Sequence, residues 1–246
     1  MPTTLRRPVR LLLAAALAAG LATALPAVPA HASSWGAPVS LNSLSFWNVV
    51  NGRWTDNNEL ETYTSSCVWY SGSTLMIKTY NAGGGVYDSG RVESKALYGY
   101  GTYSFTASMP NGDGLLPAVW GAYLNPWLPE MDAAEIVGSR PNTVYQTFHD
   151  ASNNQTQWAV NNSGGWTNAS HTYSFTWWPD HIDFSVDGVF TGTKWYTTAS
   201  GVGMHFIIDT AVGGNWPGNP DSSTWATSDG ARYLKVSGIT YTPYYP

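Results

Sequence analysis

The side chains best suited to chemistry in this sequence are three acids, Glu130, Asp132 and Glu135, within an otherwise apolar segment at residues 127–137. Two carboxyl groups held about 5–5.5 Å apart can break a glycosidic bond with retention of configuration, because one attacks the sugar while the other donates and then accepts a proton. A third carboxyl group between them can help to keep one of the pair ionised and the other protonated. The spacing therefore favours paired-carboxylate chemistry.

Two other interpretations of this acidic cluster are a solvated acidic edge and a carboxylate metal site. With 16 acidic residues in the chain, this spacing alone arises by chance with a probability of about 0.09. A calcium loop requires glycine and oxygen-rich neighbours, whereas the neighbours here include Met131, Ala133 and Ile136. We therefore favour the catalytic interpretation and expect no metal ligands in the cluster.

The apolar residues around the acids predict a buried strand. Successive side chains of a strand point to opposite faces, so Glu130 and Asp132 share a face and Glu135 does not. One extra residue in a β-bulge restores the phase. We therefore expect a bulge at Ala133–Ala134 that places all three carboxyl groups on one sheet surface.

The rest of the sequence predicts an all-β protein. Apolar residues alternate with period two at residues 103–109, 173–177 and 182–186, and each run ends at a Gly, Asn, Asp or Pro turn. No window has a convincing apolar face of helical period, and residues 221–231 allow at most a turn or two of helix. A dozen or so short strands at this spacing indicate a two-sheet sandwich or a barrel.

At the acidic cluster the sequence resembles the family-16 glycoside hydrolases. The pattern Glu130-Met-Asp132-Ala-Ala-Glu135 is similar to the catalytic signature of that family in the form that carries a bulge. Further similar segments occur in the family's order along almost the whole of residues 33–246. They are residues 57–60, 89–93, 114–120, 171–173, 186–188 and 211–218.

The resemblance implies a β-jelly-roll sandwich of two antiparallel sheets with a concave substrate cleft, and retaining hydrolysis of internal β-linkages. Carried over by position, Glu130 is implied to be the nucleophile, Glu135 the general acid and base, and Asp132 the residue that tunes the nucleophile. The bulged form resembles the laminarinase-like, endo-β-1,3-glucanase branch. That branch implies β-1,3-glucan or mixed β-1,3/1,4-glucan as substrate.

Several alternatives stay open on the sequence. Met131, the pair Ala133–Ala134 and Pro129 differ from the residues usual in that branch, and a β-galactan hydrolase or a transglycosylase would use the same three acids. A non-catalytic, lectin-like carbohydrate-binding module would share the fold and the aromatic content. Such a module has no need of three carboxylates that repel one another.

Six further residues are candidate substrate contacts. Sugar rings have apolar faces, so a cleft that binds polysaccharide needs aromatic platforms. For each tryptophan proposed as such a platform, the alternative is a position in the hydrophobic core. Asn58 and Arg91 match polar positions that contact substrate in the family, with a turn residue and a surface ion pair as alternatives. His149 ends the predicted strand after the catalytic one and is alternatively an ordinary edge-strand histidine. The tryptophan candidates are Trp120, Trp127 and Trp216.

The first 32 residues predict a removed secretory signal peptide. Arg6, Arg7 and Arg10 precede an apolar run, and the small residues of Ala30-His31-Ala32 suit a signal peptidase. Removing this segment leaves eight Lys and Arg against 16 Asp and Glu, hence a net charge of −8. Such a chain repels phosphate, which excludes nucleic acid and anionic membranes as partners.

Residues 33–246 are therefore expected to form a single domain, secreted and monomeric, whose partner is a polysaccharide. Cys67 is the single cysteine, so the domain has no intramolecular disulfide. His171, His181 and His205 have no metal-ligand spacing with one another. We expect no required cofactor, and the resemblance allows a structural calcium ion.

Overall fold

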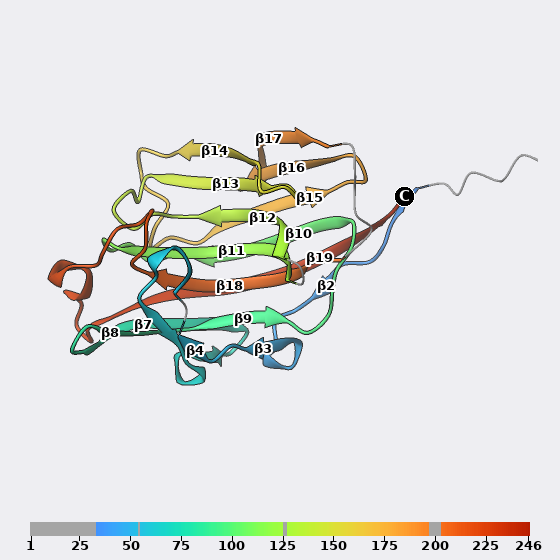
Figure 1. Ribbon diagram of the computed structural model, residues 1–246. Helices are drawn as coiled ribbons and strands as arrows, with labels where there is room; N and C mark the ends of the chain where they lie inside the picture. Colours follow the sequence, from blue (N-terminus) through green and yellow to red (C-terminus); the bar gives the residue numbers. More distant parts are fainter. Residues whose placement is uncertain (1–32, 54, 125–126, 197–202) are drawn as a thin grey trace, which may run out of the picture. The chain divides into compact units, whose positions relative to one another are not determined.

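Two β-sheets make up the chain in the computed structural model, which describes residues 33–53, 55–124, 127–196 and 203–246 (Figure 1). The signal peptide expected at residues 1–32 lies outside the described residues and stays a prediction. The two-sheet sandwich expected from the sequence is confirmed, and the barrel alternative is wrong. None of the helices in the described ranges is long and apolar enough to cross a membrane.

The seven-stranded sheet carries the acidic cluster and is antiparallel throughout. In spatial order it consists of β14 (Gln155–Asn161), β13 (Thr143–His149), β12 (Trp127–Glu135), β11 (Leu115–Leu124), β18 (His205–Val212), β9 (Arg91–Ser94) and β3 (Trp47–Val49).

The larger sheet has twelve strands, and one of its pairs, β5 with β8, is parallel. Its main path is β17 (Val189–Trp195), β16 (His181–Val186), β15 (His171–Trp177), β10 (Gly101–Ser108), β19 (Ala231–Tyr245), β7 (Thr74–Gly83), β8 (Val86–Ser89), β5 (Glu61–Tyr63) and β4 (Gly52–Arg53). The short strands β1 (Ser34–Trp35) and β2 (Val39–Ser40) pair with β19, and β6 (Val68–Ser71) pairs with β7.

Helical structure in the described ranges is limited to four short 3₁₀ turns, in agreement with the sequence. The segment 221–231 contributes a single one, η4, which Asp221 caps by accepting hydrogen bonds from the backbone of Ser223 and Thr224. The four are η1 (Leu44–Phe46), η2 (Asp56–Asn58), η3 (Ser65–Cys67) and η4 (Ser222–Trp225).

The core lies between the sheets and follows the predicted alternation. Every second residue of β10 is buried, so that Tyr103 and Phe105 face the seven-stranded sheet. There they meet Phe206 of β18, whose ring centroid lies 4.6 Å from that of Tyr103 and 5.2 Å from that of Phe105. Cys67 is free and buried, as expected of a small apolar residue. The side chains of β18 that point into the core thus hold this strand in place. Its opposite face contributes to the cavity described below.

The predicted bulge in β12 is present. Asp132 pairs with Trp120 of β11 while Ala134 pairs with Val119, so one residue of β12 has no counterpart on β11. The register with β13 shifts between Asp132 and Glu135 as well. Ala133 and Ala134 are fully buried in the core. The bulge therefore brings Glu135 onto the same face as the other two acids.

Phe206→Ala tests this arrangement. Removing a fully buried phenylalanine leaves a cavity, so we expect the free energy of unfolding to fall by about 3–5 kcal/mol. Phe190→Ala is the matched control, because Phe190 is 61% exposed, and its effect should stay within about 0.5 kcal/mol. Urea unfolding followed by fluorescence measures both. Similar losses in the two variants would contradict the packing described.

Candidate active site

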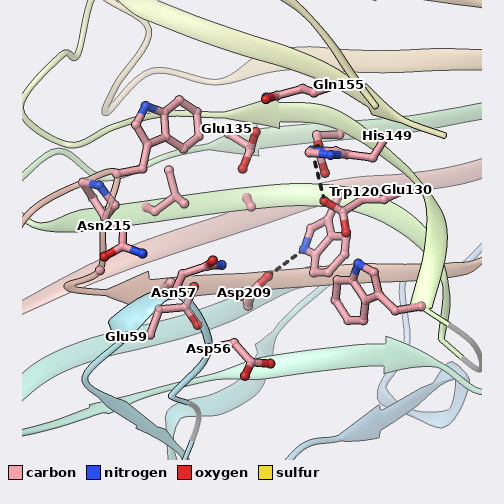
Figure 2. Close-up of a pocket in the computed structure, with 18 of the residues that line it drawn as sticks. Asp56, Asn57, Glu59, Trp120, Glu130, Glu135, His149, Gln155, Asp209 and Asn215 are labelled. Atoms are coloured by element: carbon pink, nitrogen blue, oxygen red, sulfur yellow. Dashed lines mark hydrogen bonds and ion pairs between the residues drawn. The ribbon is translucent and has the colours of Figure 1, made fainter. Parts of the chain in front are cut away.

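A cavity of about 650 Å³ lies on the face of the seven-stranded sheet that points away from the core. Side chains from β5, β9, β11, β12, β13, β14 and β18 line it, together with the loop residues Asp56, Asn57, Glu59 and Asn153 and with residues 213–217. Figure 2 shows Glu130 and Glu135 on the same side of their strand, with His149 and Gln155 on one flank and Asp209 on the other. The cavity is large enough for several sugar units in contact with the sheet.

All three acids of the cluster line this cavity. Glu130 pairs in register with His149 of β13, and the imidazole Nε2 lies 3.7 Å from Glu130 Oε1 and 3.9 Å from Asp132 Oδ2. Asp132 is 3% exposed, which excludes a solvated acidic edge. Glu135 Oε2 accepts a hydrogen bond from Thr147 Oγ1 at 3.3 Å. Thr147 thus holds Glu135, while His149 faces the other two acids without a direct hydrogen bond.

Removal from water dominates the electrostatics of the cluster. Burial, followed by repulsion from Glu130, raises the pKa of Glu135 to about 8. Burial raises the pKa of Glu130 to about 7, an effect that the Trp127 side chain partly offsets. The pKa of Asp132 is raised well above its usual range by burial and by repulsion from both glutamates. The three groups therefore share protons near neutral pH, and Glu135 holds its proton more firmly than Glu130.

His149 is a neutral partner in this environment. Burial lowers the pKa of its imidazole, against weaker opposing contributions from Asn153 and Asp150. Asn153 Oδ1 lies 3.1 Å from His149 Nδ1 and also lines the cavity wall. The histidine expected to reach the acidic cluster therefore does so, and the loop after β13 orients its ring.

Asp209 of β18 is a further buried acid beside the cluster, which was not predicted from the sequence. Its two oxygens accept hydrogen bonds of 2.7 Å from Trp120 Nε1 and from the Tyr63 hydroxyl, and Arg91 lies 4.0 Å away. Repulsion from Asp209 contributes to the raised pKa values of Glu130, Asp132 and Glu135. Its sequence signal, a single acid within an apolar strand, is weaker than the three closely spaced acids of the catalytic cluster.

The predicted contact Arg91 lines the cavity but is only 2% exposed. Its guanidinium lies 2.8 Å from Glu93 Oε1 and 5.0 Å from the centre of the Trp120 ring. Apart from His149, it is the one cationic side chain among the described residues that line the cavity. Arg91 therefore compensates the charge of the acids beneath the cavity surface.

A second pair of acids, Glu59 and Glu61, lies under the loop at one side of the cavity. Burial, followed by repulsion from Glu61, raises the pKa of Glu59 to about 8. Glu61 is fully buried, and burial raises its pKa to about 7 although its Oε2 accepts a hydrogen bond from the backbone of Val212. Val212 directly precedes the loop of Asn215 and Trp216. Glu61 thus anchors the base of that loop.

The three candidate tryptophans all line the cavity, in different states of exposure. Trp120 is 7% exposed, as in the alternative core interpretation, whereas Trp127 is 41% exposed with its ring 5.4 Å from that of Trp120. Trp216 packs edge-on against Tyr145, which pairs in register with Glu135. Trp127 and Trp216 therefore lie at opposite ends of the acidic cluster.

Asn58 is the one predicted contact that is not part of the cavity lining. Its Nδ2 donates to Asn215 Oδ1 at 2.7 Å, while the neighbouring Asn57 faces the cavity. Both asparagines adopt positive φ values, 56° and 62°. Asn58 thus supports Asn215, a lining residue. Three further amides that line the cavity, those of Asn57, Gln155 and Gln157, were not predicted from the sequence as substrate contacts.

Comparison with known proteins places the chain in a family. The model of the glycosyl hydrolases family 16 matches residues 50–238. The chain belongs to this family. Glucan endo-1,3-beta-glucosidase A1 of Niallia circulans is 30% identical over 78% of this chain, and a beta-glucanase of Rhodothermus marinus is 28% identical over 69%.

This family-16 chain spans 35% of the Niallia circulans protein, 61% of a beta-glucanase of Acetivibrio thermocellus and 70% of the Rhodothermus marinus enzyme. The solved laminarinase catalytic domain of Thermotoga maritima shares its fold, with a TM-score of 0.74 and 22% identity over 86% of this chain and 98% of that one. The Bacillus licheniformis beta-glucanase gives a TM-score of 0.70 at 20% identity, covering 81% of this chain and 92% of that one. The jelly-roll architecture implied by the sequence is thereby confirmed.

The buried acids predict an unusual dependence of stability on pH. A carboxyl group whose folded pKa lies above its unfolded value keeps its proton when the unfolded chain has lost it, so stability falls as pH rises between the two values. For Glu61 this interval runs from 4.5 to about 7, and the slope approaches about 1.4 kcal/mol per pH unit. We expect the free energy of unfolding, measured in urea, to decrease from pH 5 to pH 8.

Glu61→Gln should flatten this decrease, because the amide has the shape of the protonated acid and does not ionise. Asp113→Asn, at an exposed loop position, is the matched control and should leave the slope unchanged. A stability that is constant or that rises across the same range would contradict the raised pKa values.

Proposed function

We propose that this chain is a secreted, retaining endo-glycoside hydrolase that cleaves internal β-1,3 or mixed β-1,3/1,4 linkages of glucans. The observation that carries the proposal is the bulged strand β12, which presents three carboxyl groups on one face of an open cavity. Its curated relatives include enzymes named for β-1,3-glucan cleavage, which favours this substrate over a β-galactan. Because the substrate is neutral, the paucity of cationic groups in the cavity does not oppose binding.

In the proposed first step the Glu130 carboxylate attacks the anomeric carbon while Glu135 donates its proton to the departing glycosidic oxygen. A glycosyl ester on Glu130 results, and the shortened chain leaves with a new hydroxyl group. In the second step Glu135, now a carboxylate, takes a proton from water, and the water oxygen attacks the anomeric carbon and releases Glu130. Asp132 lies between the two groups and accommodates the shared proton.

The order of the pKa values supports these roles. The nucleophile must be ionised and the acid protonated in the same molecule. Burial raises the pKa of both glutamates; repulsion from Glu130 raises that of Glu135 further, whereas the Trp127 side chain and Arg91 offset part of the rise at Glu130. Trp127 and Trp216 are proposed as sugar platforms on either side of the cleavage point. Asn215, held by Asn58, offers an amide for sugar hydroxyl groups at the Trp216 end.

Replacing either glutamate by glutamine should abolish hydrolysis without unfolding the chain. We expect Glu135→Gln to lower kcat on laminarin by about 10²–10⁴-fold, because the general acid is lost, and Glu130→Gln to form no glycosyl ester and release no product. Reducing ends released from laminarin and lichenan measure the rate, and oligosaccharide binding by calorimetry shows that each variant still folds. Asp113→Asn is the control and should retain full activity.

Four outcomes would count against this proposal. Undiminished hydrolysis by Glu130→Gln would remove the assigned nucleophile. Release of product from agarose or galactan alone would replace the glucan by a galactan. Binding without cleavage of any of these polysaccharides would leave a carbohydrate-binding module, and transfer to added acceptor sugars in place of water would indicate a transglycosylase.

The pH dependence of kcat/KM should reflect the coupled acids. Activity is expected to fall at low pH as Glu130 is protonated and at high pH as Glu135 ionises, and both limbs should lie above the pH range in which ordinary carboxyl groups titrate. The negative charge of Asp209 raises the pKa values of Glu130 and Glu135. The substitution Asp209→Asn removes this charge, so both limbs of the pH profile should move to lower pH. An unchanged profile in this variant would show that Asp209 does not act on the pair.

A further inference from the structure

His149, Glu130 and Asp132 converge on one point of the cavity wall. One nitrogen or oxygen atom from each of the three side chains lies within 4.8 Å of the other two. At 3.7 and 3.9 Å, the distances from His149 Nε2 to the two carboxyl groups are too long for direct hydrogen bonds. The three polar groups therefore face one another across a gap.

The orientation of the imidazole determines what faces this gap. The Asn153 side-chain oxygen, which can only accept, lies 3.1 Å from His149 Nδ1, so the hydrogen of the neutral ring is on Nδ1. Nε2 then presents a lone pair to Glu130 and Asp132. A histidine whose far nitrogen donates to an oxygen acceptor is the arrangement that metal-binding histidines usually adopt.

Asp132 supplies an independent observation. Its Oδ2 is buried and, among the described residues, has no hydrogen-bond partner, while the residue as a whole is 3% exposed. Buried carboxylate oxygens are ordinarily satisfied, because leaving such a group unpaired costs several kcal/mol. The atom lies beside the lone pair of His149 Nε2. A cation between these atoms would satisfy all three groups at once.

We propose that a zinc ion binds to Glu130 Oε1, Asp132 Oδ2 and His149 Nε2. Coordination of the Glu130 carboxylate would prevent it from acting as the nucleophile and so inhibit the enzyme. With zinc–ligand distances of about 2.0–2.2 Å, two ligand atoms of a tetrahedral zinc ion are about 3.3–3.6 Å apart. The imidazole nitrogen, at 3.7 and 3.9 Å from the two carboxyl oxygens, lies within a few tenths of an ångström of that geometry. Three protein ligands leave a fourth position for water from the cavity.

The mixed donor set decides the choice of metal. Calcium and magnesium bind six or more oxygen atoms and disfavour nitrogen, whereas one imidazole and two carboxylates suit zinc. Zinc would hold the Glu130 carboxylate in a metal bond, so that it could not attack a sugar. The inhibitory effect rests on the proposed hydrolase function, but the binding of zinc does not.

Titration calorimetry of the intact protein with zinc chloride tests the binding directly. We expect one zinc ion per chain and no detectable binding of calcium chloride. Asn153→Ala keeps all three ligands but removes the group that orients the imidazole, so its zinc affinity should be about 10–100-fold weaker. His149→Gln should lose the site. His171→Gln, which changes a histidine paired with Asp187 on the other sheet, is the matched control and should bind zinc unchanged.

A parallel laminarin assay separates the two proposals. We expect zinc to inhibit wild-type hydrolysis reversibly, with full recovery on addition of a chelator and weaker inhibition of Asn153→Ala. Absence of zinc binding, or equal binding by the His149→Gln variant with its fold confirmed by circular dichroism, would overturn the zinc site. Zinc binding by a protein that cleaves no glucan would leave the site in place and refute the hydrolase function instead.

Discussion

The exclusion of water from a group of mutually repelling carboxyl groups is the constraint on which the rest of this site depends. Asp132 is buried and lies between the partly buried Glu130 and Glu135, and loss of contact with water is the largest cause of each raised pKa. Repulsion between neighbouring acids then raises the pKa values of Asp132 and Glu135 further. The resulting mixture of protonated and ionised acids is what a two-step displacement at a sugar requires.

The surrounding residues offset part of the repulsion between the acids but do not neutralise it. Arg91 lies beneath the surface between Glu93 and Asp209, where it offsets negative charge but leaves the cavity free of an exposed cation. Asp209 in turn fixes Trp120 and Tyr63 through short hydrogen bonds. Asp209, which raises the pKa values of the acids, therefore also holds the side chains that form the base of the cavity.

Features with a local periodic signal were predictable from the sequence. The strands, the paired sheets and the bulge at Ala133–Ala134 follow from alternation and from the apolar neighbours of the acids. Features that depend on long-range contacts were not. Asp209 and Tyr63 are 146 residues apart, and the successive positive φ values of Asn57 and Asn58 decide which amide faces the cavity.

The bulge in β12 also allows two residues, in place of one, between Asp132 and Glu135 while the three acids stay on one face of the strand. A regular strand with one residue fewer between Asp132 and Glu135 would display three acids on one face by simple alternation. The bulged strand displays the same three by placing its surplus alanine in the core. Deletion of one of the two alanines would thus convert the bulge into a regular strand and still leave all three acids on the catalytic face.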